Sequence, residues 1–227
     1  MLFGENQAMN YPTYSHRSVY NDIDLHGLKF RIKKGPYLSR TSIGMRRKLS
    51  DNFAPPSCPI PLVLRDFQHD DLQSLFHFNE NTFLEQEKIN ILWRLEMVSK
   101  GSLISRCFVA ADEHSGYPYH IQWLTEPGSS DQIRQALALP ALGFGEALLE
   151  NAYTPPRHRG LGIMPAAIEL IAQHNANVDR QFLIMFIDTK DYSSLSAVKK
   201  SGLLPYTVRT WEQYVFGLFQ RIRFKSI

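Results

Sequence analysis

Hydrophobic residues recur at intervals of three and four over residues 85–99 and again over residues 165–176. Because an α-helix turns once every 3.6 residues, this spacing gives each segment one apolar face and predicts two amphipathic helices. Pro165 suits the first position of the second helix. Further short helices are expected after Asp70 and Asp71, around 131–137, and between Ser193 or Ser194 as the cap and Gly202.

Short apolar runs between these helices predict strands. They cover 61–65, 107–111, 119–124, 146–154, 182–187, 204–208 and 218–224. Residues 182–187 are apolar on both alternating faces, so they are expected to form a fully buried central strand. A hairpin is expected through Ser115 and Gly116. The order gives an α/β fold, in the form of an α+β mixed sheet with helices on its faces.

The first 59 residues differ from the rest of the chain. They contain a basic stretch from Arg31 to Lys48, an alternating segment over 28–32, and the breaker-rich segment 54–59. These features predict an N-terminal extension over 1–59, partly structured, with a proline-rich linker. The main domain is expected to cover residues 60–227.

The overall charge changes this picture only slightly. The 227 residues are 44% hydrophobic and 21% charged, with a formal net charge of +3. This balance suits an anionic small ligand, and it is far weaker than the charge typical of a nucleic-acid-binding protein. No nucleic-acid partner is therefore expected, although the basic stretch keeps such a partner as a third hypothesis.

Cysteine usage and hydropathy favour a cytoplasmic location. Cys58 and Cys107 form no CxxC pair, and His114, His120 and His174 lack metal-ligand spacing, so no metal site is expected. Residues 1–11 are too polar for a signal peptide, and no apolar run is long enough to span a bilayer. We therefore expect no membrane partner.

The segment with the clearest chemical meaning is Tyr-Thr-Pro-Pro-Arg-His-Arg-Gly-Leu-Gly-Ile at 153–163. It lies between a predicted strand and a predicted helix. Such a turn brings free backbone N–H groups and the positive end of the helix dipole to one place, and its glycines allow close approach of an anion. With Arg157 and Arg159, the segment predicts a diphosphate-binding turn. It lacks the Lys-Ser/Thr of a P-loop and the first glycine of a dinucleotide-binding fingerprint.

This segment resembles the GNAT superfamily of CoA-dependent N-acyltransferases. In that family a strand ending in Val-x-Pro precedes a loop Gln/Arg-x-x-Gly-x-Gly/Ala and a helix. One register places this loop at 157–162, and the preferred register places it at 159–164, with Thr154 and Pro156 on the Val-x-Pro positions. Downstream, Asp191 to Ser194 and Lys200 to Leu203 are similar to the family's Asn-x-x-Ser/Ala and Lys-x-Gly-Phe motifs.

The resemblance implies a mixed, mostly antiparallel sheet whose two parallel central strands splay apart to admit acetyl-CoA or another acyl-CoA. It implies direct attack by a primary amine in a ternary complex, which makes the chain an N-acetyltransferase. A non-catalytic acyl-CoA-binding or sensing module is the alternative. The residues expected to bind the cofactor are Ala152, Tyr153, Thr154, Arg157, Arg159, Gly160, Leu161, Gly162, Ile163, Met164 and Ser194. Ser194 is also expected as the helix cap.

Catalytic residues are harder to assign. Glu146 and Glu150 lie four apart on the strand before the loop and would share one face of a regular strand; Glu150 is preferred as general base, with His158 as another candidate. Val198 occupies the position of the family's general-acid Tyr, which leaves Tyr192 or Tyr206 as substitutes. The acceptor is expected to be a small-molecule amine. The extension is expected either to cover the acceptor side or to mediate a homodimer.

Overall fold

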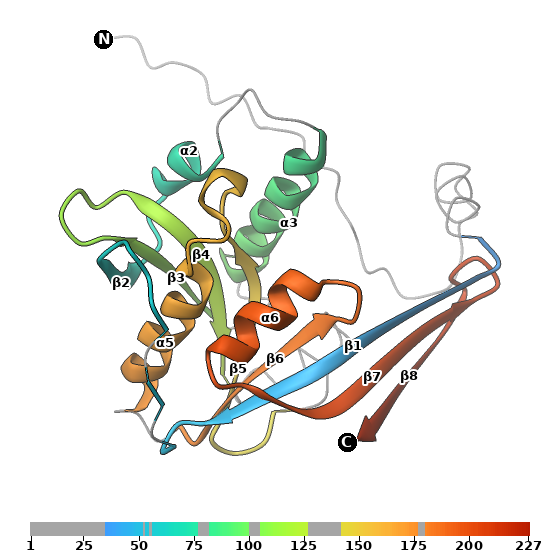
Figure 1. The fold of residues 1–227 in the computed structure, drawn as a ribbon. Helices are drawn as coiled ribbons and strands as arrows, with labels where there is room; N and C mark the ends of the chain where they lie inside the picture. The colour runs from blue at the N-terminus through green and yellow to red at the C-terminus, as the bar shows by residue number, and fades with distance from the viewer. Residues whose placement is uncertain are drawn as a thin grey trace, which may run out of the picture.

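The fold was obtained as a computed structural model, which describes residues 35–51, 53–54, 56–76, 82–99, 105–126, 142–176 and 180–227. Figure 1 shows these elements along the chain. The strand expected at 28–32 and the helix expected around 131–137 lie outside the described residues.

The described residues form one sheet of eight strands in the order β2-β3-β4-β5-β6-β1-β7-β8. The strands are β1 (Tyr37–Lys48), β2 (Leu62–Asp66), β3 (Ser105–Asp112), β4 (Pro118–Thr125), β5 (Glu146–Tyr153), β6 (Phe182–Asp188), β7 (Leu204–Tyr214) and β8 (Phe219–Ser226). Among the strand pairs in these ranges, only β5 and β6 run parallel. The expected mixed, mostly antiparallel sheet is therefore confirmed.

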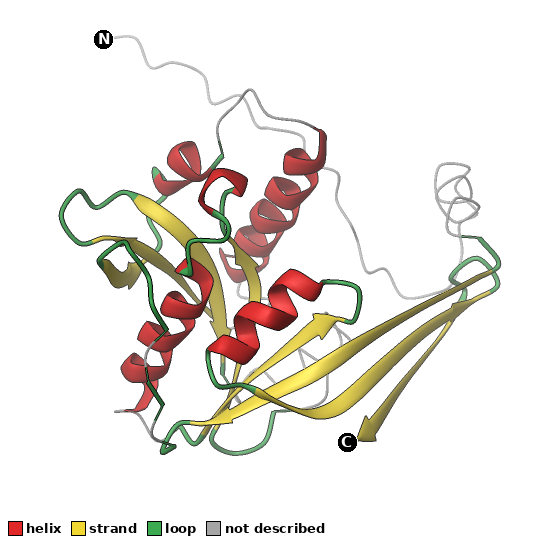
Figure 2. Cartoon of the chain, in the orientation of Figure 1, coloured by secondary structure: helices red, strands yellow, loops and turns green. Residues whose placement is uncertain are grey.

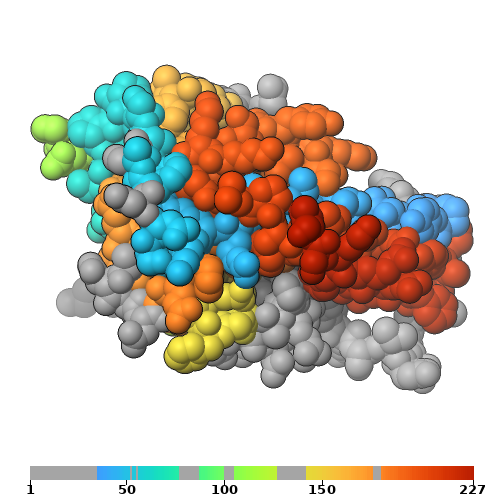
Figure 3. Space-filling view, turned by 60° about the horizontal axis from the view of Figure 1, so that its bottom comes forward, coloured from blue at the N-terminus to red at the C-terminus, as the bar shows by residue number. Residues whose placement is uncertain are grey.

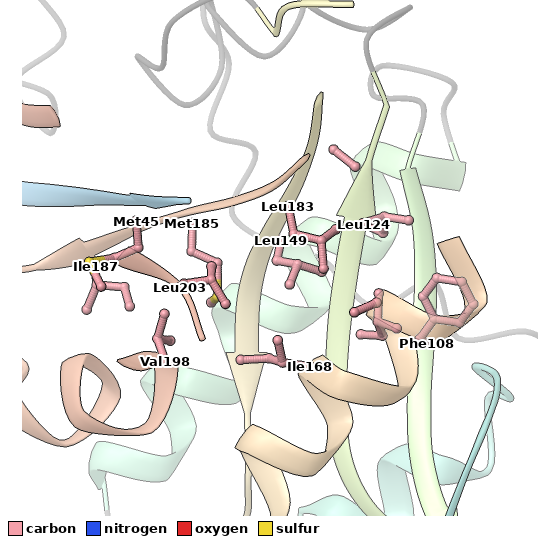
Figure 4. Packing of buried hydrophobic residues seen from close by; sticks show 13 residues of the cluster. Met45, Phe108, Leu124, Leu149, Ile168, Leu183, Met185, Ile187, Val198 and Leu203 are labelled. Carbon is pink, nitrogen blue, oxygen red and sulfur yellow. The ribbon is translucent and has the colours of Figure 1, made fainter. Parts of the chain in front are cut away.

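Helices cover both faces of this sheet (Figure 2). The α-helices are α2 (Asp71–Leu75), α3 (Thr82–Ser99), α5 (Ile163–Ala176) and α6 (Tyr192–Lys200), and the 3-10 helix η2 spans Pro156–His158. On one face, α5 and α6 pack on a buried cluster that includes Leu149, Ile168 and Met185 (Figure 4). On the other, α2 and α3 pack on a cluster around Ile121 and Trp123. The two clusters bury apolar area on either side of the sheet, and this burial drives formation of the layered fold.

The predicted division into an extension over 1–59 and a domain over 60–227 is wrong for residues 37–48, which belong to the sheet of the domain. Strand β1 lies inside the sheet, paired with β6 on one side and β7 on the other. Its basic residues belong to the strand: the Arg46 guanidinium lies 4.9 Å from the ring centres of Phe182 and Tyr206 on one face. On the other face Arg47 is buried and paired with Glu169 of α5. The alternation of polar and apolar residues in β1 does not show in the sequence, because both faces of the strand carry an arginine.

Strands β1, β7 and β8 extend beyond the helices as a long three-stranded arm. Figure 3 shows this arm beside the main body, with β1 in blue and β8 in dark red. Strand β8 lies at the edge of the sheet, and all of its residues are exposed. The two expected closing strands are thus confirmed, although β7 runs well past its expected end.

The two parallel strands separate after a short pairing. Glu146, Ala147 and Leu148 of β5 pair with Phe182, Leu183 and Ile184 of β6, and the pairing then stops although both strands continue. Beyond this point β5 leads to η2 and the start of α5, whereas β6 leads to α6. This divergence leaves backbone N–H and C=O groups of both strands without a partner from the facing strand, and such groups require other hydrogen bonds.

A β-bulge in β5 contributes to the separation. In the β4–β5 ladder Trp123 pairs with Glu150 and Ile121 with Tyr153, so Gln122 stands opposite the two residues Asn151 and Ala152. Asn151 has φ of 51°, a left-handed conformation that asparagine tolerates better than most residues. The extra residue reverses the side-chain alternation beyond it. Tyr153 therefore joins the cluster under α2 and α3 instead of facing α5.

Candidate functional site

A cleft of about 600 Å³ lies where β5 ends and α5 begins, with α6 as its second wall. It opens at the point where β5 and β6 have separated. The lining residues are Glu87, His120, Ala152, Tyr153, Thr154, His158, Arg159, Gly160, Gly162, Ile163, Met164, Pro165, Asp191, Ser193, Ser194, Ser196, Ala197 and Lys200.

The loop between β5 and α5 is shaped by its prolines and glycines. Pro155 and Pro156 end the strand as expected and lead into η2. Gly160 and Gly162 have backbone φ angles of 83° and 76°, which residues other than glycine rarely adopt. A Cβ on Gly162 would also lie 2.5 Å from the carbonyl oxygen of Ser57, whereas a Cβ on Gly160 would meet nothing within 4 Å.

Helix α5 begins at Ile163, two residues before the expected start at Pro165. The first N–H groups of a helix have no partner within the helix, and the helix dipole makes this end positive. Gly160, Gly162, Ile163 and Met164 all line the cleft, so the positive end of α5 faces it. This arrangement suits an anion such as a diphosphate.

Arg159 is the arginine of the motif that reaches the cleft. Its Nε donates to the carbonyl oxygen of Thr154 at 2.8 Å, and its Nη2 lies 3.1 and 3.0 Å from the two carboxylate oxygens of Glu87 on α3. The guanidinium is about half exposed. Arg159 is therefore held across the cleft by a carboxylate that would compete with an anionic ligand for it.

Arg157, which was expected to bind the cofactor, points elsewhere. Its Nη2 donates to the carbonyl oxygen of Ser74 at 3.1 Å and to the hydroxyl of Tyr117, and it does not line the cleft. Leu161 is 39% exposed and lies outside the lining as well. The remaining expected cofactor residues do line the cleft. They are Ala152, Tyr153, Thr154, Arg159, Gly160, Gly162, Ile163, Met164 and Ser194.

The second wall comes from the start of α6. The expectation that Ser193 or Ser194 caps this helix is wrong, because Asp191 is the N-cap and its Oδ1 accepts the Ser194 N–H at 3.0 Å. Aspartate and serine are about equally good N-caps, and here the Asp191 carboxylate also accepts the Ser193 hydroxyl at 2.9 Å. Burial works to raise the pKa of Asp191, but hydrogen bonds from Ser194 and Ser193 outweigh it and the pKa is lowered. Asp191 is thus a charged cap, and Ser194 stays on the cleft wall.

At the inner end of the cleft lies a buried histidine. His120 of β4 is 1% exposed, and its Nδ1 lies 2.7 Å from the Thr154 hydroxyl while its Nε2 lies 3.3 Å from Gln122 Oε1. Burial lowers the pKa of His120 to about 4, so the ring is neutral at ordinary pH. The bulge at Asn151 explains the contact, because it turns Thr154 to the face of the sheet on which His120 and Gln122 lie.

None of the three expected catalytic residues lines the cleft. Glu150 faces α3, where its carboxylate pairs with Arg94 and accepts the Thr125 hydroxyl. Burial raises the pKa of Glu150, against the opposing effect of Arg94. Glu146 lies at the start of β5, where it accepts the Gly143 N–H at 2.7 Å, and Tyr192 is 78% exposed. Their catalytic roles stay predictions.

Sequence reasoning missed Glu87 and passed over His120. Glu87 lies on the predicted helix 85–99, but its partner Arg159 is distant in the sequence. His120 alternates with apolar residues in a strand, as a core histidine would. A possible signal was the placing of His120 and Gln122 two apart on the buried strand 119–124, since two polar side chains on one buried face need partners.

The lining residues can be compared with the needs of a CoA diphosphate, the group that the resemblance implies. The cleft combines a helix N-terminus, two glycines that allow close approach, one arginine, Lys200 and three serines, which is a donor set for phosphate oxygens. The carboxylates of Glu87 and Asp191 oppose an anion, but each is already engaged by donors of the protein. The residues therefore fit a diphosphate.

Comparisons with known proteins concern the fold. A Drosophila protein shares 14% identity at a TM-score of 0.48, with 86% of this chain and 59% of that chain covered. A tandem GNAT protein from the clavulanic acid biosynthesis pathway shares 12% identity at 0.48, covering 78% and 54%. A GCN5-related N-acetyltransferase from Sphaerobacter thermophilus shares 14% identity at 0.47, covering 88% and 55%.

The chain thus spans little more than half the length of these three structures. No protein-family model and no curated protein sequence matches it. Several of the structural matches are named as GNAT proteins or GCN5-related N-acetyltransferases. All of these matches have TM-scores below 0.5, so the likeness carries no conclusion about the activity, substrate or residues of this chain.

In the part of the chain that the structure describes, no helix is both long and apolar enough to cross a membrane. Within the same residues, His, Cys, Asp and Glu side chains form no group of three or more that could hold a metal ion.

The buried His120 makes a prediction about stability. Unfolded histidine takes up a proton near pH 6.5, whereas His120 does so only near 4. Between these values the unfolded chain binds more protons, so the stabilisation present above pH 6.5 is lost as the pH falls. We expect His120 to lower the free energy of unfolding by about 2 kcal/mol between pH 7 and pH 5. Urea unfolding of the wild type and of His120→Asn measures this, and parallel pH profiles of the two proteins would contradict it.

Proposed function

We propose that the chain is a CoA-dependent N-acyltransferase that transfers an acyl group, in first expectation acetyl, to a primary amine. The observation that carries the proposal is a cleft where two parallel strands separate, closed at one end by a glycine-rich turn and the positive end of α5. An extended anionic ligand needs both features, because its diphosphate requires donors and its arm requires unpaired strand backbone. The loop motif at 159–164 supports the same reading.

Each part of the cleft has a role in this proposal. The backbone amides around Gly160 to Met164 would bind the diphosphate, with Arg159 and Lys200 as charged donors. The backbone of β5 at Ala152 would hydrogen-bond the pantetheine arm in the gap beside β6, with Tyr153 as the next candidate contact. Ser194, whose hydroxyl lies on the α6 wall, is a further candidate contact.

When bound, acyl-CoA would supply an activated thioester, which a deprotonated amine can attack directly. The chain would orient the two reactants and accept a proton from the amine. Glu150 is our candidate for the proton acceptor. It lies two residues before Ala152, on the face of β5 opposite α5, and burial raises its pKa toward the range useful to a base. We propose that the amine approaches from this face, on which α3 packs.

The alternative is a non-catalytic acyl-CoA-binding module. Two observations favour it: none of the expected catalytic residues lines the cleft, and Val198, at the position of the family's general acid, is fully buried in the core. The same ligand would bind in the same place, but no proton would be transferred. The first proposal takes a small-molecule amine as the acceptor and a homodimer as the assembly.

Binding of CoA is the first test. Isothermal titration calorimetry of Arg159→Gln should show affinity reduced roughly ten- to a hundredfold, since a charge-assisted hydrogen bond is lost. Arg106→Gln on β3 is the matched control, because Arg106 contacts Asp66 and His174, neither of which lines the cleft. The control should bind CoA as the wild type does. Equal losses in both variants, or no binding by the wild type, would remove the basis of the proposal.

For Glu87, the partner of Arg159, we expect a substitution to raise the affinity for CoA instead of lowering it. Glu87→Gln removes a carboxylate that competes with the diphosphate for Arg159, so CoA should bind roughly three- to tenfold more tightly. Glu113→Gln, in the exposed turn between β3 and β4, removes the same charge elsewhere and should leave the affinity unchanged. Unchanged or weaker binding by Glu87→Gln would show that the ion pair does not compete with the ligand.

Turnover separates the two functions. Thiol release from acetyl-CoA should rise above background in the presence of an accepted amine from a panel of polyamines, amino acids and amino sugars. With that amine, Glu150→Gln should lower kcat roughly ten- to a hundredfold while CoA affinity stays the same. CoA binding without amine-dependent thiol release across the panel would favour the binding module.

A further inference from the structure

The inner wall of the cleft contains a chain of polar side chains that the proposed reaction does not use. Thr154, His120 and Gln122 are joined by hydrogen bonds, and Gln122 ends against the sulfur of Met185 on β6. His120 and Gln122 are fully buried, with 1% and 0% exposure, while Thr154 and His120 line the cleft. Buried polar groups of this kind must have matched donors and acceptors.

The sulfur of Met185 sets the direction of the chain. The Gln122 amide lies between His120 Nε2 at 3.3 Å and Met185 Sδ at 4.0 Å. A thioether is a weak acceptor and has no proton to donate, so the NH₂ group faces the sulfur. The amide oxygen of Gln122 must then face His120.

The orientation of Gln122 fixes the tautomer of His120. An oxygen acceptor at Nε2 requires the ring to carry its proton there. Since burial keeps the imidazole neutral, Nδ1 has no proton and can only accept a hydrogen bond. Its neighbour at 2.7 Å is the Thr154 hydroxyl, which therefore donates its single proton to His120.

Because the Thr154 hydroxyl donates its proton to His120, it can only accept a hydrogen bond from a ligand in the cleft. Its proton is directed at His120, so only its lone pairs are available to a ligand. The backbone carbonyl of the same residue already accepts the Arg159 Nε–H at 2.8 Å. Because Arg159, Lys200 and the helix amides are all donors, Thr154 differs in polarity from the groups around the diphosphate position.

We propose that Thr154 Oγ accepts a hydrogen bond from an amide N–H of the pantetheine arm, with His120 and Gln122 as positioning residues that hold the hydroxyl in this orientation. The inference rests on the proposed function, because the arm must enter the gap beside Thr154. It assigns to this position a preference for a ligand N–H, which separates recognition of the arm from recognition of the diphosphate.

The test compares CoA with 3′-phospho-ADP, which is CoA without its arm. Thr154→Val keeps the shape of the side chain and removes the hydroxyl, and it should weaken CoA binding about fivefold in calorimetry while 3′-phospho-ADP binds as before. Thr154→Ser restores the hydroxyl and should bind CoA within about twofold of the wild type. Equal effects of Thr154→Val on both ligands, or no effect on either, would overturn the inference.

The tautomer can be measured on the wild type, independently of any variant that folds poorly. Long-range ¹H–¹⁵N correlation spectra should show His120 protonated at Nε2 and bare at Nδ1, and a proton on Nδ1 would overturn the proposed polarity. Failure of the proposed function and failure of this inference give different results. If the wild type binds neither CoA nor 3′-phospho-ADP, the proposed function fails and this inference with it; if both bind but Thr154→Val leaves CoA affinity intact, only the inference fails.

Discussion

The cleft depends on the early end of the pairing between β5 and β6. Three residue pairs hold the parallel strands together, and the bulge at Asn151 then directs β5 away. A continuous ladder would have filled the gap with inter-strand hydrogen bonds and buried the start of α5 against the sheet. Instead, strand backbone and helix amides are both exposed at one place, and a ligand can use them together.

The electrostatic balance of the cleft is set by pairs rather than by an excess of positive charge. Arg159 contacts Glu87, and Asp191 is held by the amide and hydroxyl groups at the start of α6. A diphosphate therefore competes with Glu87 for Arg159, while Lys200 and the amides at the start of α5 offer it further donors.

Most of the helices and strands could be predicted from the sequence, because the spacing of hydrophobic residues depends on local structure. The strands at 182–187 and 119–124 and the loop at 153–163 lie where they were expected. Two things were not predictable. The role of β1 was hidden because Arg46 and Arg47 are stabilised by Phe182, Tyr206 and Glu169, all distant in the sequence. The bulge at Asn151 leaves no mark in the composition of the strand. It reverses the side-chain alternation of β5, so that Thr154 faces His120 in the cleft while Glu150 faces α3.

The position of β1 has a consequence for how the molecule forms. Thr189 at the end of β6 donates to the carbonyl of Thr41 in β1, 148 positions earlier in the chain. Both neighbours of β1 in the sheet, β6 and β7, follow it in the chain by more than 130 residues, so β1 cannot take its place until both have been synthesised. Contacts between residues so far apart in sequence also slow folding, because a long loop must close before they can form. The unpaired edges of β1 therefore stay open to mispairing longer than those of the hairpin formed by β3 and β4.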